Sequence, residues 1–443
     1  MTFAARRLST LALSLLAFAA TAADIPPTFS PQQLRDDLSA LQGEIERIHP
    51  DVGHSVDKTE LLQAIAGVRK RLDRDMTANE AWVVMSTLNP TLADGHLVVI
   101  YPGGNAAEVR RHVQAGGLLF PFNVYIDPRG ELFVRSRLDG EPTPFQGARI
   151  EAIDGVRGKK ISTRLLAHTN GDTPALRTEF AAQRFAFLYW KLVGEKRAFK
   201  VRIAGKETAV EGSNVVPAAY ADAPFEDVFG FELLADKHAL LKVGKFFWPE
   251  KPKFYEFTKD AFTRMQAAGT ETLIVDIREN GGGDDDMWFD GLMPYLATKP
   301  YRNGSDYLLK VIEGRQKDGQ KVGDLVRGTQ DTWHQPALDN PLRFKGKVYV
   351  LIGPGTYSSA ILFTNAMRDY GFGTIAGTGG AARTMQSGGT QNVKLPNTQI
   401  GLVVPRFLLK RPAGGEGLVE PDVVIAADPF RPAAAVDALV RLK

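Results

Sequence analysis

The chain has 443 residues, of which 44% are hydrophobic and 24% are charged, and it contains no cysteine. This length predicts two or three domains, each with a core of its own. The formal net charge of +3 gives no reason to expect a nucleic-acid partner, which would need a clustered basic face. Without cysteine there is neither a disulfide framework nor a lipid-attachment site.

The N-terminus has the pattern of an export signal. Arg6 and Arg7 precede an apolar run over 8–20, and residues 20–22 (Ala-Thr-Ala) fit a small-x-small cleavage site. The run is short and rich in Ala and Ser for a membrane span, so an uncleaved anchor is the weaker alternative. Cleavage would leave a formal charge of 52 − 51 = +1. We expect a signal peptide over 1–22, no stable membrane span after its removal, and a periplasmic or secreted protein.

Residues 23–105 have the apolar spacing of a helical domain. Ser30 and Pro31 are typical of an N-cap followed by proline at the first helical position, and apolar residues then recur every three or four positions as far as Ile48. Two more helices are predicted, over 58–72 and 78–88. The domain ends at the turn Asp94-Gly-His96, which leads into a strand.

The rest of the chain divides into a β-rich part and an alternating part. Residues 106–210 show short strands punctuated by glycine and proline, clearest over 132–137 and 148–155, and 211–228 has the composition of a linker. From 229 to 443 strands alternate with helices, which predicts an α/β domain with a largely parallel sheet. The expected strands lie at 238–243, 273–277, 347–352 and 373–377, and the expected helices at 254–268, 287–297 and 358–369.

Two of these strands end in loops suited to acyl transfer. The strand that begins at Thr272 runs into three glycines over 281–283, and the strand over 347–352 leads to a turn that carries Ser358 and Ser359. Active sites gather where parallel strands end. Glycines let a carbonyl oxygen approach backbone amides, and a serine at the start of a helix can act as a nucleophile if a base is near. The plain alternatives are a tight turn and a pair of N-cap serines.

A base for such a serine must come from few candidates. The chain has seven histidines and no His-Glu-x-x-His motif, so no metal site is predicted. His96 is the best placed, because it lies on a turn that enters a strand. A lone histidine is also commonly structural.

Several motifs together resemble the S41 family of serine peptidases, which includes the C-terminal processing (tail-specific) and tricorn-like proteases. They are Leu-Ile-Val-Asp-Ile-Arg-Glu-Asn-Gly-Gly-Gly over 273–283, Thr-Tyr-Ser-Ser-Ala over 356–360, Met-Arg-Asp-Tyr-Gly over 367–371, and Gly-Leu-Val-Glu-Pro-Asp-Val over 417–423. The resemblance covers about 30–428. It implies a multidomain α/β (α+β) fold with an N-terminal helical bundle, a PDZ-like β module and a ClpP/crotonase-like catalytic core.

The resemblance also separates two branches of the family. The lysine that serves as base in the processing proteases falls at Arg383, and an arginine keeps its proton and cannot be a general base. The tricorn-like branch uses serine, histidine and glutamate, which match Ser358, His96 and Glu416. The match slips by about one residue near Glu416, so Glu420 is the alternative acid.

In the tricorn-like interpretation the oxyanion would be held by backbone amides. The amide of Ser359 and one from Gly282 or Gly283 are the candidates. Family members commonly have an acidic residue two positions after the nucleophile, as in Ser-x-Glu, whereas here Ala360 is followed by Ile361. We expect this change to affect helix packing or specificity.

The middle module resembles a PDZ domain through the segment over 147–155. It would either bind an extended peptide by strand addition or only shape the cleft. The resemblance implies an exported serine peptidase that acts on peptide or protein substrates without cofactor or metal. Two alternatives stay open: a binding protein on the same fold, as in retinoid-binding relatives, and an esterase or amidase acting on small or cell-envelope molecules.

Overall fold

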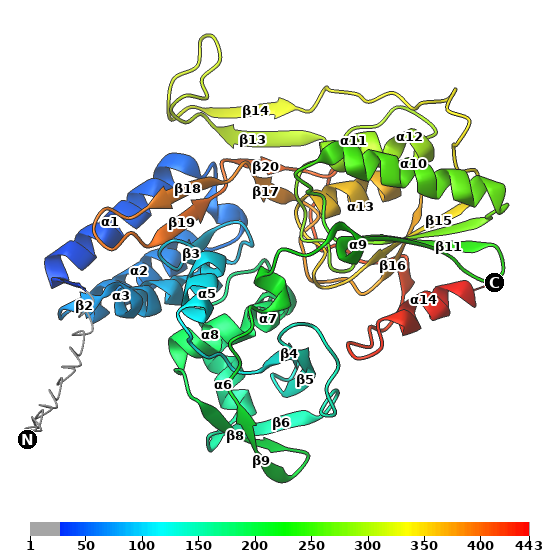
Figure 1. The fold of residues 1–443 in the computed structure, drawn as a ribbon. Coiled ribbons are helices and arrows are strands. Elements are labelled where there is room, and N and C mark those ends of the chain that lie inside the picture. Colours follow the sequence, from blue (N-terminus) through cyan, green and yellow to red (C-terminus); the bar gives the residue numbers. More distant parts are fainter. Residues whose placement is uncertain (1–26, 443) are drawn as a thin grey trace, which may run out of the picture.

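The computed structural model describes residues 27–442 and shows a mixed helix and sheet fold in three parts (Figure 1). The signal peptide expected over 1–22 lies outside the described residues. No helix within 27–442 is both long and apolar enough to cross a membrane.

The first part is helical, as its sequence predicts. Helix α1 (Pro31–Ile48) begins with a capping box, in which the Ser30 hydroxyl accepts from the Gln33 amide and the Gln33 side chain accepts from the Ser30 amide. Its periodic leucines are fully buried. The other elements here are β1 (Thr28–Phe29), α2 (Lys58–Arg71), β2 (Met76–Thr77), α3 (Ala78–Met85), α4 (Asn89–Leu92), β3 (Val98–Ile100) and α5 (Asn105–Gln114), with 3-10 turns at Val52–His54 and Ser86–Leu88.

The helical part is completed by a hairpin from near the C-terminus. Strands β18 (Gln391–Lys394) and β19 (Gly401–Val404) form a three-stranded sheet with β3, in the order β18-β19-β3. Leu395, Ile400 and Leu402 of this hairpin belong to the same core as α1 and α2. The hairpin therefore crosses the boundary expected near residue 105 and anchors the strand that follows His96.

The middle part contains an antiparallel sheet and three helices. Its strands have the order β4-β5-β6-β8-β9, and β7 adds to β6. The sequence predicts mainly strands here, yet residues 158–192 are largely helical. The elements are β4 (Phe122–Ile126), β5 (Leu132–Arg137), β6 (Arg149–Ile153), β7 (Val156–Arg157), α6 (Gly158–Leu166), α7 (Pro174–Gln183), α8 (Phe185–Leu192), β8 (Ala198–Ile203) and β9 (Lys206–Glu211).

The third part is an α/β domain built on a six-stranded sheet. The strand order is β10-β11-β12-β15-β16-β21, and all neighbours are parallel except β10 and β11. The first five strands and their helices are β10 (Phe229–Leu233), β11 (His238–Val243), α10 (Lys251–Ala267), β12 (Thr272–Asp276), α11 (Asp286–Gly291), α12 (Met293–Leu296), β15 (Lys347–Ile352), α13 (Ser359–Asp369) and β16 (Thr374–Gly377). The last elements are β21 (Val423–Val424) and α14 (Ala433–Val440), and α9 (Phe225–Val228) precedes β10.

Both faces of this sheet are covered, as continuous apolar strands require. Leu273 and Val275 of β12 face the core shared with α10, α11 and α13, whereas Ile274 faces the core shared with α14. The sheet therefore lies between two helical layers, and the predicted parallel α/β fold is confirmed. The loops after β12 and β15 emerge side by side because these two strands are neighbours.

A smaller sheet connects this domain to the helical part. It has the order β14-β13-β20-β17 and consists of β13 (Asp306–Lys310), β14 (Leu325–Thr329), β17 (Gln386–Gly388) and β20 (Phe407–Leu409). Strand β17 lies at one edge, where it pairs only with β20 among the described strands. This position brings residues 386–388 to the junction between the two larger parts (Figure 1).

Candidate active site

The turn before α13 holds Ser358 in an unusual backbone conformation. Ser358 has φ 56° and ψ −126°, a positive φ that a residue with a Cβ rarely adopts. Such strain persists only where surrounding contacts enforce it, and it is typical of nucleophile turns between a strand and a helix. Here the Thr356 hydroxyl donates to the Ile277 carbonyl (2.8 Å) and the Tyr357 amide donates to the Asn280 carbonyl (3.0 Å).

The two serines of this turn have different surroundings. The Ser359 hydroxyl is buried and bonded to Asp285 and to the Trp288 indole N–H, which lies 3.0 Å away. The Ser358 hydroxyl lies instead 3.0 Å from Nε2 of His96. Of the two serines, Ser358 is thus the one whose hydroxyl lies within hydrogen-bond reach of a histidine.

The glycines after β12 allow this turn to pack closely. Gly282 has φ 104°, and a Cβ added there would lie 2.6 Å from the Ser358 Cβ. The Gly282 amide donates to Oδ1 of Asn280 (2.9 Å), so it is not free to bind an oxyanion. Within residues 27–442 the amides of Gly283 and Ser359 have no hydrogen-bond acceptor. The predicted set of Gly282, Gly283 and Ser359 is therefore corrected to the last two amides.

The turn that carries His96 is held by side chains from remote segments. The Gly95 amide donates to Oδ1 of Asp172 (2.9 Å) and lies 3.1 Å from the Tyr357 hydroxyl, while Nδ2 of Asn170 donates to the Gly95 carbonyl (2.6 Å). A Cβ at Gly95 would lie 2.5 Å from the Tyr357 ring, so only glycine fits. The segment between α6 and α7 therefore fixes the position of His96.

The hydrogen bonds around His96 define its tautomer. Nδ1 of His96 lies 3.0 Å from the Ser387 hydroxyl, and that hydroxyl donates to Oδ1 of Asp94 (2.9 Å). Because a carboxylate only accepts, the Ser387 hydrogen is committed to Asp94, and the Ser387 oxygen can accept from Nδ1–H. Neutral His96 then has a lone pair on Nε2, which faces the hydroxyl of Ser358. This is the protonation state that a general base needs.

The predicted acids lie elsewhere. Glu416 has a largely exposed side chain that pairs with Lys410 at 3.4 Å. Glu420 is also exposed, and its carboxylate lies against Gly379 and Gly380. The expected contact of Glu416, or of Glu420, with His96 is thus not formed, because Ser387 occupies Nδ1.

Burial and nearby charges set the protonation of these groups. Burial lowers the pKa of His96 below its ordinary value of 6.5, and the negative charges of Asp94 and Asp172 offset part of that shift. Burial alone would raise the pKa of Asp94, but the hydrogen bond and charge of His54 outweigh it and the net pKa falls. Burial raises the pKa of Asp172. His96 is therefore neutral and Asp94 charged at neutral pH.

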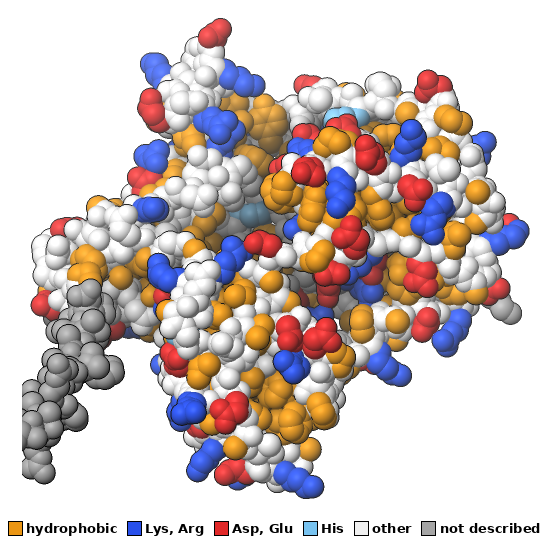
Figure 2. Space-filling model, in the orientation of Figure 1, with side chains coloured by type: hydrophobic (Ala, Val, Ile, Leu, Met, Phe, Trp, Pro, Cys, Tyr) orange, Lys and Arg blue, Asp and Glu red, His pale blue; other side chains and the backbone are white. Residues whose placement is uncertain are grey.

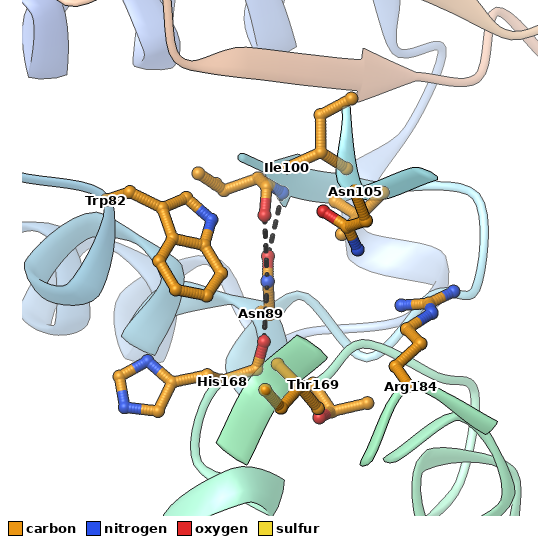
Figure 3. Close-up of a pocket in the computed structure, with 10 residues that line it drawn as sticks. Trp82, Asn89, Ile100, Asn105, His168, Thr169 and Arg184 are labelled. Atoms are coloured by element: carbon orange, nitrogen blue, oxygen red, sulfur yellow. Dashed lines mark hydrogen bonds between the residues drawn. The ribbon is translucent and has the colours of Figure 1, made fainter. Parts of the chain in front are cut away.

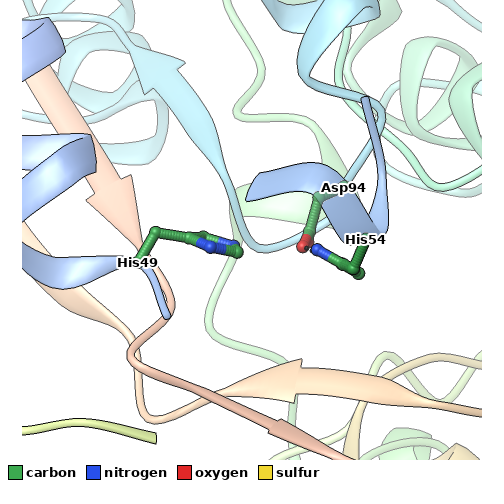
Figure 4. A group of neighbouring side chains, drawn as sticks. All are labelled: His49, His54 and Asp94. Carbon is green, nitrogen blue, oxygen red and sulfur yellow. Dashed lines mark ion pairs between the residues drawn. The ribbon is translucent and has the colours of Figure 1, made fainter. Parts of the chain in front are cut away.

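One group of side chains has the composition of a metal site. His49, His54 and Asp94 place ligand atoms within 4.8 Å of one another (Figure 4). However, the Asp51 amide donates to Nδ1 of His49 (3.1 Å), so neutral His49 has its hydrogen on Nε2 and no lone pair there for a metal. Nε2 of His54 lies 3.1 Å from Oδ2 of Asp94. These contacts describe a histidine–aspartate pair beside a second histidine rather than a metal centre.

Arg383 lies at the position where the resemblance places a lysine, and its contacts give it a structural role. Its guanidinium donates to the Ala93 carbonyl (2.7 Å), and its amide donates to Oδ2 of Asp172 (3.0 Å). It therefore ties the His96 turn to Asp172. Ala360, at the position where the resemblance places an acidic residue, is buried in the α/β core together with Ile361.

Cavities elsewhere do not offer an alternative centre of this kind. Figure 3 shows a cavity of about 10 Å³, room for one water, where Asn89 bridges the His168 carbonyl (2.9 Å) and the Val99 backbone. A cleft of about 330 Å³ lies on the middle sheet between Arg149 and Glu207 and is lined by exposed charged residues. The face in Figure 2 is hollowed between the helical part and the α/β domain.

Sequence reasoning missed the residues that hold Ser358 and His96 in place. Asp94 had a local signal, because an aspartate two positions before His96 can accept from its amide, as it does at 2.7 Å. Ser387, Asp172 and Asn280 had none, because they contact His96, Gly95 and Tyr357 respectively, which lie far from them in the chain.

Comparisons with known proteins bear on the family of the α/β domain and on the fold. The model of peptidase family S41 matches residues 237–425, which include Ser358 and the glycine loop. None of the curated proteins matches the chain. Among solved structures, mature CPAF is similar with a TM-score of 0.65 and 14% identity over 93% of this chain and 96% of that chain. CPAF in complex with lactacystin is similar with a TM-score of 0.63 and 14% identity over 93% and 98%. At this identity the likeness shows the shared fold, and the match over residues 237–425 supports a serine peptidase of family S41 in the α/β domain.

Proposed function

We propose that the chain is an exported peptidase that cleaves peptide bonds through an acyl-enzyme on Ser358, with His96 as the general base. The observation that carries this proposal is the 3.0 Å contact between the Ser358 hydroxyl and Nε2 of His96. A serine becomes a useful nucleophile only with such a base within hydrogen-bond reach.

The reaction follows from the geometry. His96 takes the Ser358 proton as Oγ bonds to the substrate carbonyl carbon, and it returns the proton to the leaving amine when the C–N bond breaks. The Gly283 and Ser359 amides are the free donors for the oxyanion, and each such donor is typically worth about 3 kcal/mol in the transition state. A water molecule, activated by the same imidazole, then releases the acyl group.

Two other functions are less well supported. A pure binding protein has no need of a strained serine with a locked imidazole beside it. An esterase or amidase would use the same groups, so substrate class must be measured. Export is supported by the N-terminal pattern of two arginines, an apolar run and Ala-Thr-Ala.

Labelling with a fluorophosphonate probe tests the proposal directly. Wild type should be labelled, Ser358→Ala should not, and His96→Ala should be labelled at least about 1,000-fold more slowly. Ser359→Ala is the matched serine variant and should keep a reactive Ser358. Folded wild-type protein that takes up no label would exclude the enzyme mechanism. A peptide library assayed beside simple esters then separates peptidase from esterase action.

A further inference from the structure

We propose that Ser387 and Asp94 together do the work of the third member of a catalytic triad, with Ser387 linking the imidazole of His96 to the buried carboxylate of Asp94. This inference rests on the proposed function. Both are positioning residues, because they act on substrate only through His96.

The chain of hydrogen bonds runs in one direction. Nδ1–H of His96 points to the Ser387 oxygen, and the Ser387 hydrogen points to Oδ1 of Asp94. The same Oδ1 accepts from the His96 amide at 2.7 Å. One carboxylate oxygen thereby fixes both the backbone and, through Ser387, the ring of the base.

The residues that form this hydrogen-bond chain are buried, and Asp94 at its end is held by a further contact. Asp94 is 1% exposed and Ser387 6% exposed. Oδ2 of Asp94 is held by Nε2 of His54 at 3.1 Å, and Nδ1 of His54 lies 3.0 Å from the Asp51 carbonyl. Both nitrogens of His54 face acceptors, and these two contacts keep Asp94 in one orientation.

Charge develops on His96 during the reaction, and this arrangement stabilises it. When Nε2 receives the Ser358 proton, the ring becomes an imidazolium. Its Nδ1–H strengthens its bond to Ser387, whose hydroxyl is oriented by the negative charge of Asp94. The Ser387 hydrogen stays on its own oxygen, so no proton passes to Asp94. Because the Ser387 hydroxyl lies between them, Asp94 stabilises the imidazolium less than a carboxylate in direct contact would.

Other charged groups also face the base and must be separated from Asp94. Asp172 reaches the His96 turn from the segment before α7, Tyr357 packs its ring 4.8 Å from the imidazole, and Arg383 pairs with Asp172. His54 and His49 lie behind Asp94. Of these groups, only Asp94 is joined to Nδ1 of His96 through a hydroxyl.

The test compares Ser387→Ala and Asp94→Asn with Thr390→Ala, which removes an exposed hydroxyl three positions further along the same segment. We expect kcat to fall about 100-fold in Ser387→Ala and about 1,000-fold in Asp94→Asn, with little change in KM. Thr390→Ala should match wild type. Ser387→Thr, which restores a hydroxyl, should recover most of the loss.

The pH profile adds a readout that a merely structural part would not change. The ascending limb of kcat/KM reports the pKa of the base in the free enzyme. Because the Asp94 charge favours the imidazolium, its loss should lower the pKa of His96 and move that limb to lower pH in Asp94→Asn. Ser387→Ala leaves the charge of Asp94 in place and should therefore move the ascending limb less.

The outcomes separate this inference from the proposed function. If Ser358→Ala is inactive while Ser387→Ala and Asp94→Asn keep wild-type kcat and an unmoved limb, the inference is overturned and the peptidase proposal stands. If Ser358→Ala is itself active, the proposed function fails. Should Asp94→Asn not fold, as judged by its thermal melting curve, Ser387→Ala with its Ser387→Thr partner decides.

Discussion

The turn that carries Ser358 and the turn that carries His96 are held in the active site by different kinds of contact. The Ser358 turn joins a consecutive strand and helix, and its anchors at Ile277 and Asn280 lie on the loop after the neighbouring strand of the same sheet. The His96 turn is held by Asp172, Tyr357 and Ser387, which come from three different parts of the fold.

This difference explains why substitutions at the two turns affect different groups of the active site. A change near Ser358 acts on the nucleophile and on the oxyanion amides at once, because Gly282 contacts the same turn. A change near His96 acts on one side chain, and several independent contacts oppose its displacement. We therefore expect a glycine-to-alanine substitution to have a larger effect at the first turn than at the second.

Among the glycine substitutions, the largest effect is expected for Gly282→Ala. Its Cβ would lie 2.6 Å from the Ser358 Cβ and 2.9 Å from the Ser359 amide nitrogen, at a φ of 104° that alanine disfavours. We expect kcat/KM to fall about 1,000-fold, since both the nucleophile and an oxyanion donor move. Steady-state kinetics on a cleavable peptide measures this.

The neighbouring glycine supplies the control. A Cβ at Gly281 meets no atom within 4 Å, so Gly281→Ala should stay close to wild type. Equal losses in the two variants would mean that the loop needs flexibility in general rather than close approach at Gly282.

A smaller loss is expected for Gly95→Ala. The added Cβ would lie 2.5 Å from the Tyr357 ring, and the turn must shift away with His96. A displacement of about 1 Å typically costs about 100-fold in kcat. Fluorophosphonate labelling rates should fall in parallel, because His96 activates Ser358 for both reactions.

Gly67→Ala is matched to this change, because Gly67 lies on the exposed side of α2 with open space around it. That variant should be fully active and more stable by about 0.5–1 kcal/mol, since alanine favours a helix over glycine. A Gly95→Ala enzyme with normal labelling would show that Tyr357 yields and that the turn is not rigidly held.

The same contrast determines which features of the fold and of the site could be predicted from the sequence. The strands over 238–243 and 347–352 and the serine turn follow from apolar runs and turn residues, which are local signals. The pairing of His96 with Ser358 came from resemblance, because no spacing links residues 262 positions apart. The hairpin over 391–404 joins β3 of the helical part through backbone pairing that its own residues do not specify.

The smallest effect is expected for Glu416→Gln, and it bears most directly on how the His96 turn is organised. The Glu416 side chain is 65% exposed and pairs with a half-buried Lys410 at the surface. Exposed ion pairs of this kind contribute about 0–1 kcal/mol to stability. We expect kcat/KM within about twofold of wild type, because no proton or charge of the reaction passes near this carboxylate. Glu420→Gln should behave alike.

If Glu416→Gln instead lost activity about as strongly as His96→Ala, the loop over 411–417 would have to close onto His96 when substrate binds, displacing Ser387 from Nδ1. The order of effects would then reverse, with Ser387→Ala nearly silent. Measuring the activities of Glu416→Gln and Ser387→Ala side by side therefore shows which group orients His96. If only Ser387→Ala loses activity, the orienting role belongs to the buried Asp94 rather than to the exposed glutamate.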